Sequence, residues 1–88
     1  MTALEDAINI GPVLAAELRL AGFATLEDLQ AAGEVEAVHR LRAVNPQRDC
    51  SNSALAIAGA IRGVRWMKIP PADRRQILDD VNARPGSR

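Results

Sequence analysis

A tight turn at Asn9-Ile10-Gly11-Pro12 constrains the fold more than any other segment of the chain. Asparagine and glycine adopt a positive φ more readily than other residues, and proline is best tolerated in the first turn of an α-helix. The pattern predicts a short helix over residues 3–8, a turn, and a second helix that runs to about Ala21 and is terminated by Gly22. Two short helices joined in this way form a helix-hairpin-helix, a unit that often binds the phosphate backbone of nucleic acids.

A third and a fourth helix follow the hairpin. Thr25 and Asp28 have the spacing of a capping box, so a helix begins there with Phe23 packed back onto it. Gly33 separates this helix from the next, which covers residues 34–44. The sequence therefore predicts two short helices in this region rather than one long helix.

The fifth predicted helix covers residues 51–62 and is capped by Ser51 or Ser53. Gly59 lies inside it, where glycine costs about 1 kcal/mol relative to alanine. Such a glycine needs a packing reason, and we expect the close approach of another helix. Gly63 ends the predicted helix.

One small all-α domain accounts for the chain. With 88 residues it can bury a single modest core, and no sustained alternation of apolar and polar residues predicts a strand. We expect an extended connection over residues 64–69, a last helix over residues 72–81 opened by the second of two prolines, and a frayed tail over residues 84–88. The predicted fold is a compact domain of five to six short helices over residues 1–83, of the helix-hairpin-helix or SAM-like type.

Charge is distributed unevenly along the chain, although the formal net charge is zero. Residues 1–36 hold seven acidic residues and one basic residue, whereas residues 37–75 hold eight basic and two acidic residues. Zero net charge argues against a strong sequence-independent attraction to phosphates. A set of basic residues from the middle of the chain is nevertheless a candidate patch for DNA or an acidic protein: Arg40, Arg42, Arg48, Arg62, Arg65 and Lys68. The alternative is that these side chains are separately solvated or neutralise helix C-termini.

The hairpin is the other candidate site for phosphate. In nucleic-acid-binding hairpins, backbone N–H groups of the turn and of the following helix point at a phosphate. Here those groups belong to Ile10, Gly11, Val13 and Leu14. No lysine or arginine follows the turn directly, and three acidic residues lie near it in the sequence. An architectural turn is therefore the preferred interpretation, with phosphate contact as the alternative.

Three isolated residues of chemical interest receive structural interpretations. Trp66, the sole tryptophan, is expected to fill the gap between helices as a core residue, with a partner contact as the alternative. His39 is expected at the surface, because no second ligand with metal-site spacing accompanies it. Cys50 has no base beside it in the sequence and is interpreted as structural or incidental.

The chain shows no pattern typical of an enzyme. No nucleophile–base arrangement, P-loop or paired metal ligands can be found, so we expect no catalytic activity, no cofactor, no metal and no small-molecule substrate. A single cysteine and the lack of a leader or of a membrane-length apolar run favour a reducing, cytoplasmic setting without membrane contact.

Five segments of the chain form a recognisable combination: residues 9–15, 21–29, 41–44 and 59–66, followed by Ile69-Pro70. Together they resemble a known family, the C-terminal domain of the TfoX/Sxy proteins of bacterial competence. An Asn-Ile-Gly-Pro hairpin followed about fifty residues later by Gly-Val-Arg-Trp is the most specific part of the resemblance, which spans about Leu4 to Leu78. The resemblance implies a compact helical domain and a role in the regulation of DNA-uptake genes together with other transcriptional machinery.

The predicted function is that of a non-enzymatic interaction domain acting by protein–protein contact in a transcription-related setting. A homodimer is a corollary, because an acidic and a basic face on one small domain can complement each other across two copies. The alternative is a weak, sequence-independent DNA-binding module that uses the hairpin amides, the basic residues or both.

Overall fold

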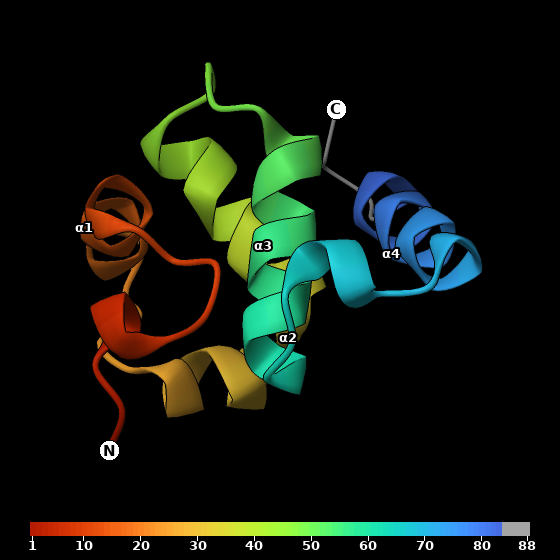
Figure 1. Cartoon of the computed structure of the whole chain (residues 1–88). Coiled ribbons are helices and arrows are strands. Elements are labelled where there is room, and N and C mark those ends of the chain that lie inside the picture. Colours follow the sequence, from red (N-terminus) through yellow and green to blue (C-terminus); the bar gives the residue numbers. More distant parts are fainter. Residues whose placement is uncertain (84–88) are drawn as a thin grey trace.

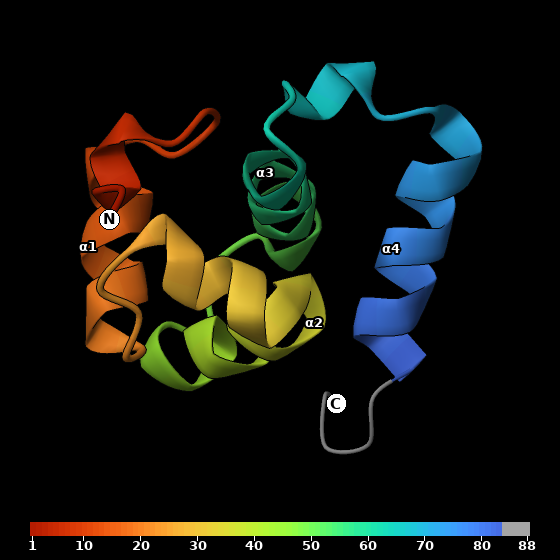
Figure 2. The same ribbon diagram turned by 90° about the horizontal axis from the view of Figure 1, so that it is seen from below.

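The computed structural model describes residues 1–83 and contains four α-helices and two 3-10 helices in that range (Figure 1). The elements in chain order are η1 (Leu4–Asp6), α1 (Pro12–Leu20), α2 (Leu26–Val44), α3 (Cys50–Arg62), η2 (Trp66–Lys68) and α4 (Pro71–Ala83). Helix α3 lies in the middle, with α1 on one side and α4 on the other, and α2 crosses beneath it in the view of Figure 2. The all-α prediction is confirmed, and the predicted tail over residues 84–88 lies outside the described residues.

The predicted number of helices is slightly too high, because the first one is only a single 3-10 turn. The N–H of Ala7 donates to the carbonyl of Leu4 at 3.1 Å, and Ala7 then leaves the helical region with ψ 142°. Starting an α-helix fixes several residues for one hydrogen bond, and the turn at Asn9 leaves too few residues to extend it. Asn9 adopts φ 72°, so the left-handed position of the hairpin belongs to asparagine, whereas Gly11 is extended.

The capping box at the start of α2 is present as predicted. The Asp28 N–H donates to Thr25 Oγ1 at 3.2 Å, and Asp28 Oδ2 accepts from the Thr25 N–H at the same distance. The two predicted helices run together as α2, but Gly33, with φ 85° and ψ 162°, breaks the helical path between them. Phe23 is buried next to the cap, also as predicted.

The N-cap of α3 is Asp49, not Ser51 or Ser53 as the sequence suggested. Its carboxylate accepts from the N–H groups of Ser51 and Asn52, at 3.1 and 3.2 Å. A carboxylate at this position also interacts favourably with the positive end of the helix dipole. Ser53 is instead buried inside the helix. Gly63 ends α3 in the left-handed conformation with φ 74°, as predicted.

The core is built mainly from aliphatic side chains of the four α-helices, joined by Leu4 of η1 and by Phe23, and it closes without Trp66. The largest fully buried side chains are Leu4, Leu18, Leu29, Leu41, Ile57 and Val38. Trp66 is 39% exposed, so the prediction that it fills the core is wrong. The buried positions of α3 are rich in alanine and include Gly59, and such small residues allow close packing that leaves no gap of indole size.

Two carboxylates tie down the N-terminal segment, which predicts acid sensitivity. Glu27 accepts from the N–H and the hydroxyl of Thr2, both at 2.8 Å, and Glu5 pairs with Arg19. The bonds from Thr2 lower the pKa of Glu27 to about 2, and the bond from Arg19 lowers the pKa of Glu5 to about 2. Both values lie below the usual 4.5, so the stability that these carboxylates contribute is present above pH 4.5 and is lost as the pH falls toward 2.

We expect the thermal unfolding midpoint, followed by circular dichroism, to decrease as the pH is lowered from 4.5 to 2. In Glu27→Gln this decrease of the midpoint should be smaller. The exposed Asp79 on α4 supplies the control, since Asp79→Asn should leave the profile as it is. An acid transition of unchanged depth in Glu27→Gln would contradict the assignment.

Candidate functional site

The hairpin presents three of the four predicted amides at the start of α1. The N–H of Ile10 donates to the carbonyl of Ala7 at 3.3 Å and is therefore already engaged. Gly11 is the N-cap of α1 and makes no side-chain cap, so no side chain satisfies the first N–H groups, which include those of Val13 and Leu14. Arg19, the basic residue of this region, is paired with Glu5. The hairpin thus has uncapped donors but no free cation of its own.

Asn9 joins the hairpin to the segment that precedes and enters η2. Its Nδ2 donates to the carbonyl of Val64 at 2.9 Å, and its Oδ1 accepts from the N–H of Trp66 at 3.3 Å. The hairpin loop and η2 accordingly lie side by side in both ribbon views (Figures 1 and 2). The two sequence motifs that are about fifty residues apart form one contact. Sequence reasoning missed this contact, and the only local signal was an asparagine at a turn.

Gly59 lies directly beneath this contact. A Cβ atom at position 59 would lie 2.5 Å from Asn9 Nδ2 and 2.6 Å from the carbonyl oxygen of Val64. The predicted close approach is therefore real, but it comes from the Asn9 turn and the chain leaving α3, not from another helix. Glycine is required at this position because backbone and side-chain amide occupy the space of a Cβ.

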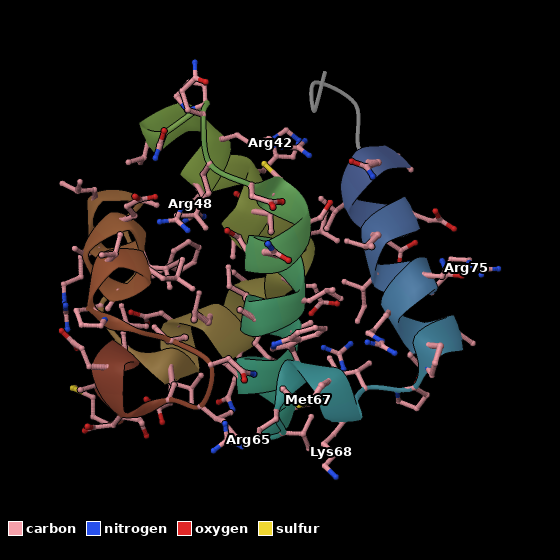
Figure 3. All side chains as sticks on the ribbon, turned by 45° about the horizontal axis from the view of Figure 1, so that its top comes forward. Arg42, Arg48, Arg65, Met67, Lys68 and Arg75 are labelled. Atoms are coloured by element: carbon pink, nitrogen blue, oxygen red, sulfur yellow. The ribbon has the colours of Figure 1, made fainter. Side chains whose placement is uncertain are left out.

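The six basic residues predicted as one patch do not converge. Figure 3 shows Arg42 and Arg48 at one end of the molecule and Arg65 and Lys68 at the other. Arg42 Nε donates to Cys50 Sγ at 3.1 Å, which places the thiol in a structural contact at the start of α3. Of the two alternatives, the structure agrees with separate residues, because the six lie on α2, α3, η2 and the loops between them and do not meet on one face.

Three arginines of that set, Arg48 among them, are ion-paired within the chain. Arg40 Nε lies 2.8 Å from Glu36, and Arg62 Nη1 lies 3.2 Å from Glu34. Arg48 pairs with Glu17 in a partly buried position, and their hydrogen bond lowers the pKa of Glu17 and raises that of Arg48. These three cations are neutralised by glutamates of residues 1–36, so half of the six-residue set is ion-paired in the fold.

The segment that leaves α3 and enters η2 exposes both apolar and basic side chains, and together with Arg74 of α4 we call it the Trp66 surface. It consists of Val64, Arg65, Trp66, Met67, Lys68 and Arg74. Val64, Trp66 and Met67 are 37%, 39% and 57% exposed. The guanidinium of Arg74 lies over the indole at 5.8 Å from the ring centre. Within residues 1–83, neither Arg65 nor Lys68 forms an ion pair, and both side chains are exposed near Met67 (Figure 3).

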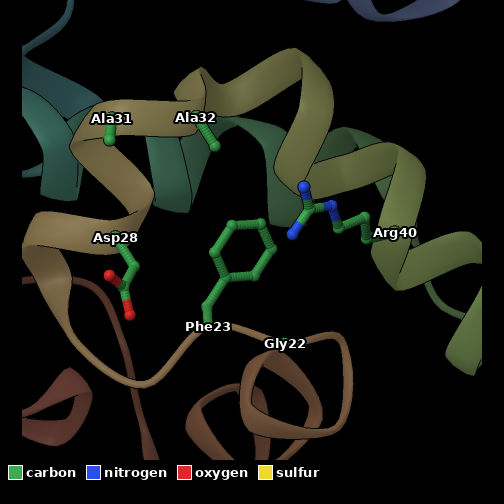
Figure 4. Close-up of a pocket in the computed structure, with 6 residues that line it drawn as sticks. All are labelled: Gly22, Phe23, Asp28, Ala31, Ala32 and Arg40. Atoms are coloured by element: carbon green, nitrogen blue, oxygen red, sulfur yellow. The ribbon is translucent and has the colours of Figure 1, made fainter.

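A shallow hollow of about 300 Å³ next to Phe23 is the other notable surface feature (Figure 4). It is lined in part by Asp28 and Arg40. Asp28 serves the capping box, and Arg40 is held by Glu36 and lies over the Phe23 ring at 4.9 Å. Both charged residues that line this hollow are therefore already engaged by partners within the chain.

The described residues 1–83 include neither a metal-binding cluster nor a helix able to cross a membrane. Residues 1–83 contain no cluster of three or more histidine, cysteine, aspartate or glutamate side chains placed to hold a metal ion. None of the helices in that range is long and apolar enough to span a membrane. His39, which the sequence placed at the surface, is partly buried on α2.

The fold and the Trp66 surface define a small all-α domain whose N-terminal hairpin is tied to a 3-10 turn that presents apolar and basic side chains. The chain matches the TfoX C-terminal domain over residues 1–81 and belongs to that family, as the resemblance of its motifs indicated.

Two solved structures from Listeria monocytogenes share the fold. One, described as an uncharacterized protein, is 30% identical with a TM-score of 0.81, over 86% of this chain and 85% of that chain. The other, described as a protein of unknown function, is 29% identical with a TM-score of 0.82, over 90% of this chain and 96% of that chain. No curated protein matches the chain.

Proposed function

We propose that this domain is a non-enzymatic interaction module that acts by protein–protein contact in the transcriptional control of DNA-uptake genes, in the cytoplasm. Family membership supports the regulatory setting. The observation that carries the proposal is the pairing of charges. Arg40, Arg48 and Arg62 are neutralised within the chain, whereas Trp66 and Met67 remain exposed. Tryptophan, methionine and arginine are enriched in protein interfaces, while duplex binding depends mainly on unpaired cations.

Weak, sequence-independent DNA binding is the second candidate. One observation favours it. The uncapped N-terminus of α1 is tied through Asn9 to the segment that carries Arg65 and Lys68, so amide donors and free cations lie on neighbouring segments. This candidate predicts binding that weakens steeply with salt.

Two measurements test the proposed function. In the organism that encodes the chain, deletion of its gene is expected to lower the transcript levels of DNA-uptake genes, and the wild-type gene should restore them. Fluorescence anisotropy of a labelled DNA duplex is expected to show no saturable binding at low salt. Unchanged transcripts in the deletion strain would overturn the regulatory assignment.

Duplex binding with a steep salt dependence would favour the second candidate, and two variants then locate it. Gly11→Glu places a carboxylate at the N-cap of α1, whereas Arg65→Glu with Lys68→Glu reverses the free cations. Loss of binding in the first variant assigns the hairpin, and loss only in the second assigns the cations of the Trp66 surface.

A further inference from the structure

We propose that the Trp66 surface binds an acidic amphipathic helix of a partner protein. Apolar side chains of that helix would pack on Val64, Trp66 and Met67, and its carboxylates would pair with the surrounding cations. The inference rests on the proposed function, since it supplies the surface for the protein contact. It follows from the composition of this surface, from its rigidity, and from the engagement of the glutamates of the chain.

The composition of the surface combines an apolar centre with a basic rim. Three apolar side chains within four consecutive residues are exposed, and none of them belongs to the buried core. Arg65 and Lys68 flank Met67 in the view of Figure 3, and Arg74 lies against Trp66. A surface of this kind is complementary to a segment that has apolar residues on one face and carboxylates along its edges.

The surface is held rigidly by the rest of the fold. The N–H of Trp66 donates to Asn9, and the carbonyl of Val64 accepts from the same side chain. The Cα atom of Trp66 lies close to Gly59, only 3.3 Å from where a Cβ of that residue would stand. Pro70 and Pro71 follow directly and limit the backbone on the other side. A tryptophan anchored in this way loses little conformational entropy on binding, which favours its use as a contact residue.

The engagement of the glutamates disfavours a second copy of the chain as the occupant. Glu5, Glu17, Glu34 and Glu36 are each paired with an arginine of their own chain, and Glu27 is bonded to Thr2. A second copy would have to break these bonds to offer any glutamate and could otherwise present only its exposed aspartates. Duplex DNA is also disfavoured, because the exposed apolar centre gives phosphates nothing to bind.

A synthetic peptide tests the inference on the whole chain. The peptide has about 16 residues, with leucines at helical spacing i, i+3, i+4 and i+7 and glutamates between them. It contains no tryptophan, so the emission of Trp66, the sole tryptophan of the protein, reports binding directly. We expect a saturable blue shift with a Kd of about 10–100 µM. A scrambled peptide of the same composition should not bind.

Variants locate the contact on the surface. Arg65→Glu with Lys68→Glu is expected to raise the Kd at least about tenfold, and Lys68→Glu alone and Met67→Ala about threefold to tenfold each. Arg75→Glu is the matched control for Lys68→Glu, because Arg75 is an exposed cation on α4 that points away from η2 in Figure 3. Circular dichroism confirms that each variant is folded, which is expected for exposed side chains.

Several outcomes would overturn the inference. They are no saturable shift up to about 1 mM peptide, an equal effect of Arg75→Glu and Lys68→Glu, and displacement of the peptide by an oligonucleotide. Light scattering that shows a dimer whose formation blocks the peptide would assign the surface to a second copy instead. If the peptide does not bind but deletion of the gene lowers the transcripts, the inference about the Trp66 surface is wrong and the proposed function stands. If the peptide binds but the deletion leaves the transcripts unchanged, the proposed function is wrong and the binding surface stands.

Discussion

Gly59→Ala is expected to destabilise the protein by about 2–3 kcal/mol, although alanine has the higher helix propensity by about 1 kcal/mol. The added Cβ would stand 2.6 Å from the carbonyl oxygen of Val64 and 2.5 Å from Asn9 Nδ2. Because the carbonyl belongs to the backbone, the chain leaving α3 must shift, which weakens the contact between the hairpin and η2. The free energy of unfolding from urea titration measures the loss.

Gly11→Ala is the matched control, because no atom lies within 4 Å of a Cβ at that position and its φ is −89°. We expect a cost below about 1 kcal/mol there, as for a weaker N-cap. The double variant Asn9→Gly with Gly59→Ala should lose less free energy of unfolding than the sum of the losses in the two single variants. Asn9→Gly removes the side-chain amide, which is one of the two clashing groups, and glycine tolerates the φ of 72° at that position. Additive losses, or a tolerated Gly59→Ala, would contradict this account of the packing.

Leu18→Ala is expected to cost about 3–4 kcal/mol, a large part of the roughly 5–15 kcal/mol by which small domains are stable. Leu18 is fully buried on α1 and belongs to the core cluster that includes Leu4 and Phe23. Truncation leaves a cavity among side chains that the surrounding helices hold in place. Thermal and urea unfolding followed at 222 nm should show a lower midpoint with an unchanged two-state transition.

Leu20 provides an internal control for this prediction. It lies on the same helix two residues further on and is 75% exposed. Leu20→Ala should change the free energy of unfolding by less than about 0.5 kcal/mol. The substitution is the same as in Leu18→Ala, so any difference in helix propensity between leucine and alanine is the same in both variants. Equal losses in the two variants would show that α1 is not packed by the face that the structure indicates.

The local signals of the sequence were reliable guides to the fold. The capping box of Thr25 and Asp28 and the stop at Gly63 were found in the structure where they were predicted. Each depends on the φ of one residue or on hydrogen bonds between residues no more than a few positions apart. The N-cap of α3 was predicted wrongly although its hydrogen bonds are equally local. Asp49, Ser51 and Ser53 are all good capping residues within five positions, and the prediction named the two serines.

The candidate sites were predicted less well because they depend on contacts far apart in the sequence. Glu17 meets Arg48 across 31 positions and Glu34 meets Arg62 across 28, and with the pair of Glu36 and Arg40 half of the apparent basic patch is neutralised. The exposure of Trp66 follows from how closely the small residues of α3 let their neighbours approach, which composition does not reveal. The link from Asn9 to Trp66 spans 57 positions.

The sequence by itself determined the all-α class, the order and most of the limits of the helices, and the family, because capping residues, glycines, prolines and apolar spacing act over one or two helical turns. Only the tertiary structure decided which cations are free, where the tryptophan lies, and that the hairpin and η2 form one surface. The physical reason is that charge pairing and exposure depend on the directions in which packed helices point their side chains, and those directions are set by contacts across the whole chain.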